Sequence, residues 1–330
     1  MKFFLYNTLI LYLFFSCNSD DSKEVNGYNS EIPIVQALPT FEVTLEENII
    51  YGQGLSHTSI NSSTPTSIPL KLDVYKPNNN TKSRPVYMFI HGGGFIGGSK
   101  QALNIKALAD YYSSRGWVFV AIDYRLRDDF GTVPQEWLDY AENIPSIQVA
   151  QYLAIYPAQR DAKAALRWIV ANSNTYNINT NYITVGGSSA GAITAITAGI
   201  SAQDDFKNEL STMQDPSLEN TNTQETYTIK TIIDYWGSKV ALDVLEEIYA
   251  YQRFSSNMPS IFIAHGTEDT IVPFSSAEQL KTIYDANGVT SAYYPFEGEI
   301  HGPWGATFNN KKLDELSFEF IVAQQKLIVQ

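Results

Sequence analysis

A serine between two glycines is the first candidate for chemistry in this sequence. Residues 187–191 read Gly-Ser-Ser-Ala-Gly, so Ser189 lies at the centre of a Gly-x-Ser-x-Gly pattern. A nucleophilic serine on a sharp strand-to-helix turn needs very small neighbours, because the strand and the helix approach each other closely there. Residues 182–185 have the pattern of a buried strand and residues 190–200 that of a helix, so the context fits. Ser188 is a rival nucleophile with small neighbours, but only Ser189 is flanked by both glycines.

A run of three glycines provides the second candidate. Residues 91–94 read His-Gly-Gly-Gly and directly follow a predicted strand. Glycines leave backbone N–H groups free to point at a ligand, and the intermediates of acyl transfer need such donors at about 3 Å from their oxyanion. We expect the amides of Gly93, Gly94 and Ala190 to form this oxyanion hole. A phosphate-binding loop is excluded, because no Lys-Ser or Lys-Thr pair follows.

A serine nucleophile also needs a base and an orienting acid. In the serine hydrolases that carry a Gly-x-Ser-x-Gly turn, the acid follows a late strand and the histidine follows the final one. Only His301 comes after the final predicted strand, and Asp269 follows the strand that ends at His265. This order predicts His301 as the base and Asp269 as the acid that orients it, with Glu268 as the alternative acid. The chain has four histidines, His57, His91, His265 and His301.

These motifs together resemble a known family. The sequences His-Gly-Gly-Gly-Phe at 91–95, Asp-Tyr-Arg-Leu at 123–126 and Gly-Ser-Ser-Ala-Gly at 187–191 are similar to those of the esterase and lipase branch of the α/β hydrolases, close to the hormone-sensitive-lipase-like enzymes. The resemblance runs from about residue 68 to the C-terminus. It implies a carboxylesterase or lipase that works through an acyl-enzyme on Ser189.

Neither a cofactor nor a metal is expected, because the sequence has no His/Cys/Asp cluster at metal-ligand spacing. The predicted partner is an ester substrate, either a small molecule or one carried on a polymer. The sequence does not distinguish short acyl esters, acetylated or feruloylated glycans and synthetic polymers. Two other functions are open: a serine peptidase of the prolyl-oligopeptidase type, which normally carries a long β-rich domain before the hydrolase part, and a non-catalytic binding protein, which normally loses a triad member.

The remaining sequence predicts one catalytic domain over residues 41–330. Of the 330 residues 44% are hydrophobic, enough for a large core. Strand and helix patterns alternate, which predicts an α/β fold with a mostly parallel eight-stranded sheet flanked by helices. Two insertions interrupt the alternation, an aromatic-rich one at 127–158 and a polar, solvated one at 201–228. The clearest strand patterns cover 68–75, 86–90, 117–122, 182–185, 229–236, 261–264 and 292–296, and the helical patterns cover 161–171, 190–200, 276–286 and 311–327.

The N-terminus has the features of an exported lipoprotein. Residues 1–16 form a short apolar run behind a lysine, as in a signal peptide, and are followed by Cys17. Cys17 is the only cysteine, so no intramolecular disulfide forms, and its position after a small residue resembles a lipoprotein cleavage box. We expect lipidation at Cys17 and a tether over residues 17–40.

The predicted location follows from the residues after Cys17. The stretch 18–24 is acidic and resembles the surface-export signal of lipoproteins from Bacteroidetes-like bacteria. That resemblance implies a lipid anchor in the bacterial outer membrane, with the domain exposed at the cell surface. The formal charge of -13 disfavours a nucleic-acid partner, because the surface repels phosphates.

Overall fold

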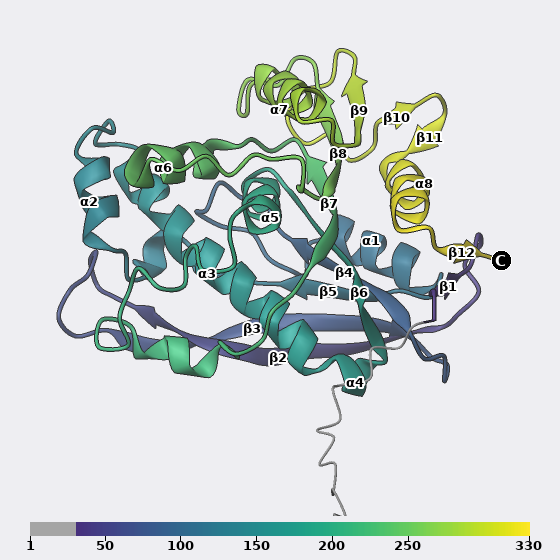
Figure 1. Ribbon diagram of the computed structural model, residues 1–330, viewed down its shortest axis with the longest axis horizontal. Helices are drawn as coiled ribbons and strands as arrows, with labels where there is room; N and C mark the ends of the chain where they lie inside the picture. The colour runs from purple at the N-terminus through teal and green to yellow at the C-terminus, as the bar shows by residue number, and fades with distance from the viewer. Residues whose placement is uncertain (1–30) are drawn as a thin grey trace, which may run out of the picture.

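The computed structural model describes residues 31–330 (Figure 1). The predicted signal peptide (1–16) and the predicted lipidation site Cys17 therefore lie outside the described residues. Within residues 31–330, no helix combines the length and the hydropathy that a membrane span requires.

An eight-stranded sheet forms the centre of the domain. Its strand order is β2-β3-β5-β4-β6-β7-β8-β9. The β2–β3 and β3–β5 pairs are antiparallel and the other neighbours are parallel, so the prediction of a mostly parallel sheet is confirmed. The strands are β2 (Val43–Ser56), β3 (Thr66–Pro77), β4 (Arg84–Ile90), β5 (Val118–Ile122), β6 (Ile178–Ser188), β7 (Ile229–Tyr235), β8 (Ser260–Gly266) and β9 (Ser291–Phe296).

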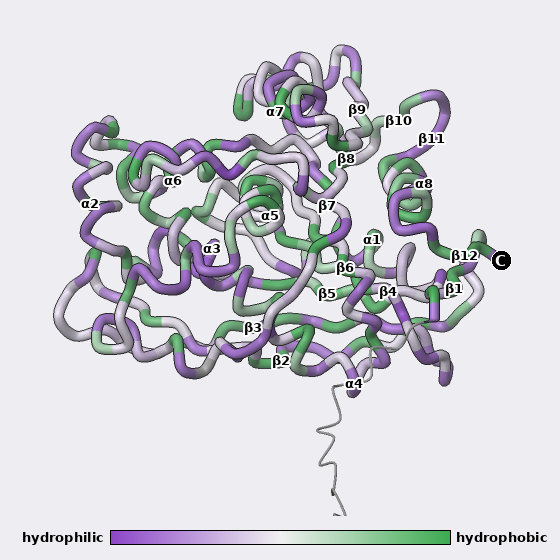
Figure 2. Tube along the Cα trace, in the orientation of Figure 1, coloured by the Kyte–Doolittle hydropathy of each residue, from purple (hydrophilic) through white to green (hydrophobic). Residues whose placement is uncertain are grey.

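Helices cover both faces of this sheet (Figure 1). Alternate residues of each strand point to opposite faces, so the sheet contributes to two hydrophobic clusters. Figure 2 shows hydrophobic residues along α5 (Ala190–Ile200) and the strands beside it. On one face lie α1 (Leu103–Ser113) and α8 (Leu313–Gln325), and on the other α3 (Val149–Ala171), α5 (Ala190–Ile200), α6 (Val240–Tyr249) and α7 (Ser275–Ala286).

Several short elements lie outside the sheet and these layers. They are β1 (Ile34–Val35), η1 (Arg127–Asp129), α2 (Gln135–Ala141), α4 (Ser173–Tyr176), η2 (Pro216–Asn220), β10 (Thr307–Phe308), β11 (Lys311–Lys312) and β12 (Ile328–Val329).

The predicted insertion at 127–158 is only partly correct. The helix predicted over 161–171 begins earlier, at Val149, and continues through Pro157. The second part of the predicted insertion is therefore the first half of α3, and only η1, α2 and their connections interrupt the α/β alternation. The prediction failed because α3 is buried along most of its length and carries polar residues on its buried surface, which hides a helical hydrophobic period.

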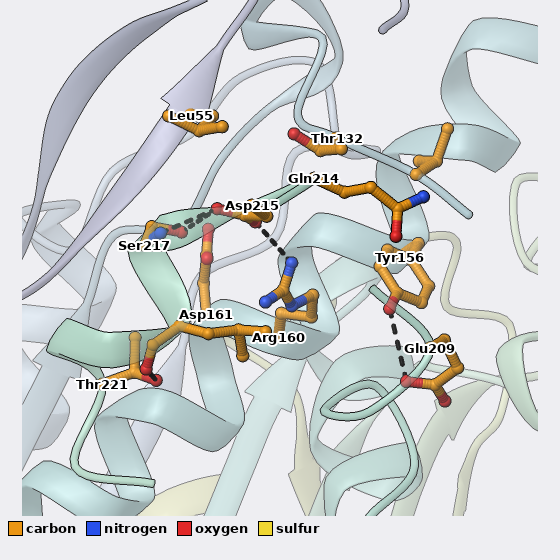
Figure 3. A network of polar contacts seen from close by, with 12 residues as sticks. Leu55, Thr132, Tyr156, Arg160, Asp161, Glu209, Gln214, Asp215, Ser217 and Thr221 are labelled. Carbon is orange, nitrogen blue, oxygen red and sulfur yellow. Dashed lines mark hydrogen bonds and ion pairs between the residues drawn. The ribbon is translucent and has the colours of Figure 1, made fainter. Parts of the chain in front are cut away.

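The prediction of a solvated excursion at 201–228 is only partly correct. Residues 202–204 and 211–214 are exposed, but other parts of the segment are buried. Phe206 and Leu210 are buried, and buried cations of α3 bind this segment (Figure 3). Arg160 pairs with the buried carboxylate of Asp215, which also accepts a hydrogen bond from the hydroxyl of Ser217. We call residues 201–228 the clamp segment, because buried cations of α3 hold it in addition to apolar contacts such as that of Phe206 with Tyr156.

Two further cations of α3 hold the clamp segment through its backbone. The Nζ of Lys163 donates to the carbonyls of Ala202 (2.5 Å) and Asp205 (2.9 Å). The Nε of Arg167 donates to the carbonyl of Thr221 at 2.7 Å. These contacts explain the hydrophilic turns that α3 shows in Figure 2, although the helix is buried.

The last part of the predicted tether (17–40) belongs to the folded domain, which corrects that prediction. β1 pairs in parallel with β12, and Val35 is fully buried. The carbonyl of Glu31 accepts a hydrogen bond from the Ser83 hydroxyl at 2.8 Å. The chain therefore enters the domain beside the first residue of β4, at the end of the sheet opposite the carboxyl ends of the parallel strands.

Candidate active site

Ser189 lies on a strained turn between β6 and α5. Its backbone has φ 53° and ψ −121°, a conformation that side chains rarely adopt and that structures tolerate mainly at functional sites. A Cβ on Gly187 would lie 2.3 Å from the carbonyl carbon of Gly191, and one on Gly191 would lie 2.1 Å from the carbonyl oxygen of Ile90. Both glycines are therefore required by close backbone contacts, as the sequence pattern predicted.

The three side chains that the chain order selected form one hydrogen-bonded series. The Oγ of Ser189 lies 2.9 Å from Nε2 of His301, and Nδ1 of His301 lies 2.6 Å from Oδ2 of Asp269. Asp269 is buried, whereas the His301 side chain is 21% exposed and faces the solvent side of the site. Of the two alternatives, Ser188 and Glu268, neither makes a hydrogen bond to His301 in the described structure.

The Asp269 carboxylate is held by more than His301. Its Oδ1 accepts the N–H groups of Ile271 (2.8 Å) and Val272 (3.0 Å). Its Oδ2 also lies 3.2 Å from Nε2 of His265, which is 2.8 Å from the carbonyl of Val272. The turn that follows β8 is thus closed around the carboxylate, with one oxygen bound by the backbone and the other shared by two imidazoles.

His265 is a residue whose place at the site sequence reasoning missed. Its side chain is completely buried, and burial lowers the pKa of this histidine, so the imidazole is neutral at pH 7. Because Nε2 faces a carbonyl and a carboxylate, the single proton of the neutral ring lies on Nε2. Nδ1 is buried and has no hydrogen-bond partner within residues 31–330. The sequence offered one signal, the location of His265 at the end of the strand that precedes Asp269.

The glycine loop after β4 packs directly on the catalytic turn. Gly93 and Gly94 have positive φ values of 121° and 63°, and a Cβ on Gly92 would lie 2.7 Å from the carbonyl oxygen of Ser188. The N–H groups of Gly93, Gly94 and Ala190 have no hydrogen-bond acceptor in the described part of the chain. The predicted donors are thus free at the turn, and the Gln151 side chain of α3 fixes the loop by donating to the Gly94 carbonyl at 2.8 Å.

The remaining two histidines do not reach Ser189. His91 is buried, its ring stacks on Tyr124 with centroids 4.4 Å apart, and the Tyr124 hydroxyl donates to the His91 carbonyl at 3.0 Å. Burial lowers the pKa of His91, so it supports the loop as a neutral ring. His57 lies 2.9 Å from the hydroxyl of Thr132 through Nε2, which is a structural contact.

Comparisons with known proteins identify what this fold and site are similar to. The model of the BD-FAE family matches residues 72–147 and 138–248. Esterase LipC of Mycobacterium tuberculosis is 25% identical over 253 residues, which cover 70% of this chain and 56% of LipC. The chain therefore spans about half the length of the curated relatives it matches.

Solved structures give the same fold. Esterase 2 of Thermogutta terrifontis phosphorylated by paraoxon superimposes with a TM-score of 0.57 at 22% identity, covering 83% of this chain and 95% of that one. A truncated carbohydrate esterase from gut microbiota gives a TM-score of 0.59 at 19% identity, covering 88% and 99%. These likenesses confirm the predicted α/β-hydrolase fold.

Proposed function

Because this chain belongs to the BD-FAE family and has the α/β-hydrolase fold, we propose that it is a serine carboxylesterase with Ser189 as its nucleophile. The observation that carries this proposal is the unbroken series from the Ser189 hydroxyl through His301 to the buried Asp269. A hydroxyl becomes a useful nucleophile at neutral pH when a base within hydrogen-bond distance removes its proton, and the base works when a third group orients it.

The proposed reaction has two steps. The Ser189 oxygen attacks the ester carbonyl carbon while His301 Nε2 takes the hydroxyl proton, and the carbonyl electron pair moves to its oxygen. When that pair returns, the bond to the alkoxy oxygen breaks and His301 delivers the proton to the departing alcohol. Water then attacks the acyl-enzyme with the same proton transfers and releases the acid. Asp269 stays ionised and stabilises the imidazolium in both steps.

The oxyanion hole is assigned to the amides of Gly93, Gly94 and Ala190. These N–H groups are free, and the Ala190 amide lies at the N-terminus of α5, where the helix dipole favours negative charge. Donors that are fixed before the reaction stabilise the developing charge without reorganising, and losing one costs roughly 100-fold to 1,000-fold in kcat. Both Gly93 and Gly94 are in the left-handed region, which keeps their amides in place at little conformational cost.

The substrate of this site is an ester on a small molecule or on a polymer. The similarity over 88% of this chain to a carbohydrate esterase from gut microbiota favours including glycan-borne esters among the substrates to be tested. The test compares the rates at which the protein hydrolyses p-nitrophenyl esters of rising chain length, acetylated xylan and a peptide amide. Hydrolysis of the esters but not of the amide is expected. Faster cleavage of the amide would favour the prolyl-oligopeptidase-like alternative.

The nucleophile is tested by paired substitutions of the two serines. Ser189→Ala should lower turnover of p-nitrophenyl acetate by about a millionfold, the usual cost of losing the nucleophile of a triad. Ser188→Ala should cost about tenfold or less, because this side chain makes no hydrogen bond to His301 in the described structure. A fluorophosphonate should label Ser189, as read by mass spectrometry. An adduct on Ser188, or full activity in Ser189→Ala, would contradict the assignment.

We also propose that the protein is anchored through a lipid on Cys17, in the outer membrane and at the cell surface. The support is the apolar run of residues 1–16 and the single cysteine that follows it. Cys17→Ala should move the protein from the membrane fraction to soluble or unprocessed material and abolish incorporation of labelled palmitate. Unchanged membrane retention and labelling would exclude this anchor.

A further inference from the structure

A second polar groove lies at the end of the sheet opposite Ser189. It has a volume of about 360 Å³ and is bordered by the first residue of β4, the end of β3 and the turn between α4 and β6. β4 runs from this groove to the glycine loop of the active site, so the two sites are separated by about 20 Å of strand. The residues that matter for its chemistry are Lys76, Asn78, Asn79, Arg84, Thr175 and Asn177.

Arg84 lies at the base of this groove as a buried cation without a carboxylate partner. It is 3% exposed, and its Nη2 donates to the carbonyl of Asn79 at 2.7 Å and to the side-chain oxygen of the same residue. Its Nε is buried without a partner, and its Nη1 has no acceptor within residues 31–330. Burial lowers the pKa of Arg84, because nothing nearby offsets the lost hydration of the charge.

Three other buried arginines of the described residues have a carboxylate partner. Arg125 donates to both oxygens of Asp161, Arg160 pairs with Asp215 and Arg253 pairs with Asp205. Arg167 has no carboxylate partner either, but its guanidinium donates to the carbonyl and the hydroxyl of Thr221. A buried charge that lacks an opposite charge is costly, so such a group normally has a partner. Arg84 has no carboxylate partner within residues 31–330, yet it borders an open groove from which a partner can reach it.

The net charge of the groove is positive. Lys76 forms an ion pair with Glu46, which also accepts a hydrogen bond from the hydroxyl of Tyr176 at 3.0 Å. That pair is internally neutral, so the guanidinium of Arg84 leaves one positive charge in excess. In a chain with a formal charge of -13, a local positive excess selects anions at this place.

The rest of the lining indicates which anion fits. The rim carries the side-chain amides of Asn78, Asn79 and Asn177 and the hydroxyl of Thr175, groups that both donate and accept. Such groups bind alcohol hydroxyls, which also donate and accept. We propose that this groove binds an acidic sugar residue, with the Nη1 of Arg84 donating to its carboxylate and the rim amides binding its hydroxyls.

Titration of the purified protein with glucuronate tests the proposal, with glucose and sulfate as the two matched probes. Calorimetry should detect binding of glucuronate at least tenfold tighter than that of either probe. Sulfate binding as tightly as glucuronate would overturn the sugar part, because the site would then be a plain oxyanion site. If glucose bound as tightly as glucuronate, the role of the cation would be overturned. If none of the three ligands bound, the whole proposal would be overturned.

Variants place the binding at the groove. Arg84→Gln should weaken glucuronate binding more than tenfold, whereas Lys281→Gln, which removes an equal charge from the exposed surface of α7, should leave it unchanged. Because Arg84→Gln could fail to fold, Thr175→Trp provides a second route: it fills the groove from an exposed position and should abolish binding. Unchanged binding in Thr175→Trp would overturn the proposal.

An assay of ester hydrolysis tests independently whether glucuronate binds at the groove or at the active site. Glucuronate at saturation should not inhibit hydrolysis of p-nitrophenyl acetate by the unaltered protein, because the groove and Ser189 lie at opposite ends of the sheet. Competitive inhibition would show that the sugar binds at the active site and would overturn the proposal. The binding titration does not depend on esterase activity, so failure of one proposal is distinguishable from failure of the other.

Discussion

The catalytic turn and the clamp segment are held in place by different kinds of contact. At residues 187–191 the contacts are backbone to backbone, and they leave no space for a Cβ at Gly187 or Gly191. At residues 201–228 the contacts include those of buried cations of α3 with carboxylates and carbonyls. The first region is specified by five consecutive residues. The second depends on partners that are 39 to 55 positions apart in the sequence, so that no short motif records it.

This contrast predicts that substitutions at Ser189, Asp269 and His301, which we call the catalytic edge, lower turnover. Substitutions in the clamp segment should instead lower the stability of the fold. After the loss of Ser189 itself, Asp269→Asn should have the largest effect, a loss of about 10⁴-fold in kcat, because an amide favours the wrong histidine tautomer. Hydrolysis of p-nitrophenyl acetate measures it, with Glu268→Gln as the matched control and little change expected there. A damaging Glu268→Gln beside a mild Asp269→Asn would show that the acid is assigned wrongly.

The clamp should respond in the opposite manner. Arg160→Met leaves the buried Asp215 without its partner, which typically costs about 3–5 kcal/mol in the free energy of unfolding. Urea unfolding measures this cost. Replacing both partners, Arg160→Met with Asp215→Leu, should recover much of it, and kcat/KM of the folded protein should change far less than in Asp269→Asn. A stability loss below about 1 kcal/mol would show that the pair does not hold the clamp.

His265 tests whether the catalytic edge also depends on a buried side chain. His265→Leu removes the Nε2 donor from the Asp269 carboxylate, and a hydrogen bond to a charged group is worth about 1.5–3 kcal/mol. We expect kcat to fall roughly tenfold to a hundredfold while KM changes little. His265→Gln, which keeps an N–H near the same position, should restore most of the rate. Equal damage in both variants would show that His265 only fills space.

Lys163 should give the smallest effect. Burial lowers the pKa of Lys163 from the ordinary 10.5 to about 7. Between these values the unfolded chain holds the proton more firmly than the folded one, so the free energy of unfolding rises with pH across this window. The rise should be about 1 kcal/mol between pH 7 and pH 8. Lys163→Met should remove this part of the pH dependence, and an unchanged slope would contradict it.

The sequence predicted the parts of this molecule whose cause is local. The strand–turn–helix around Ser189 follows from small residues at fixed spacing, and the chain order placed Asp269 and His301 where the structure brings them together. β2 was missed, because its pairing with β3 shifts register between Glu46 and Ile49, so that its residues do not alternate regularly. The buried part of the clamp segment was missed, because polar residues that bind distant partners have the same sequence pattern as polar residues that face water.

The place where the chain joins the domain has a consequence for how a tethered molecule would stand. Glu31 contacts Ser83 at the start of β4, whereas the Ser189 hydroxyl lies beyond the other end of the parallel strands. With a lipid on Cys17, the bilayer would lie nearer the groove of Arg84, and the catalytic edge would face outward. In that arrangement the proposed active site would open toward the surrounding water rather than toward the lipids beneath the domain.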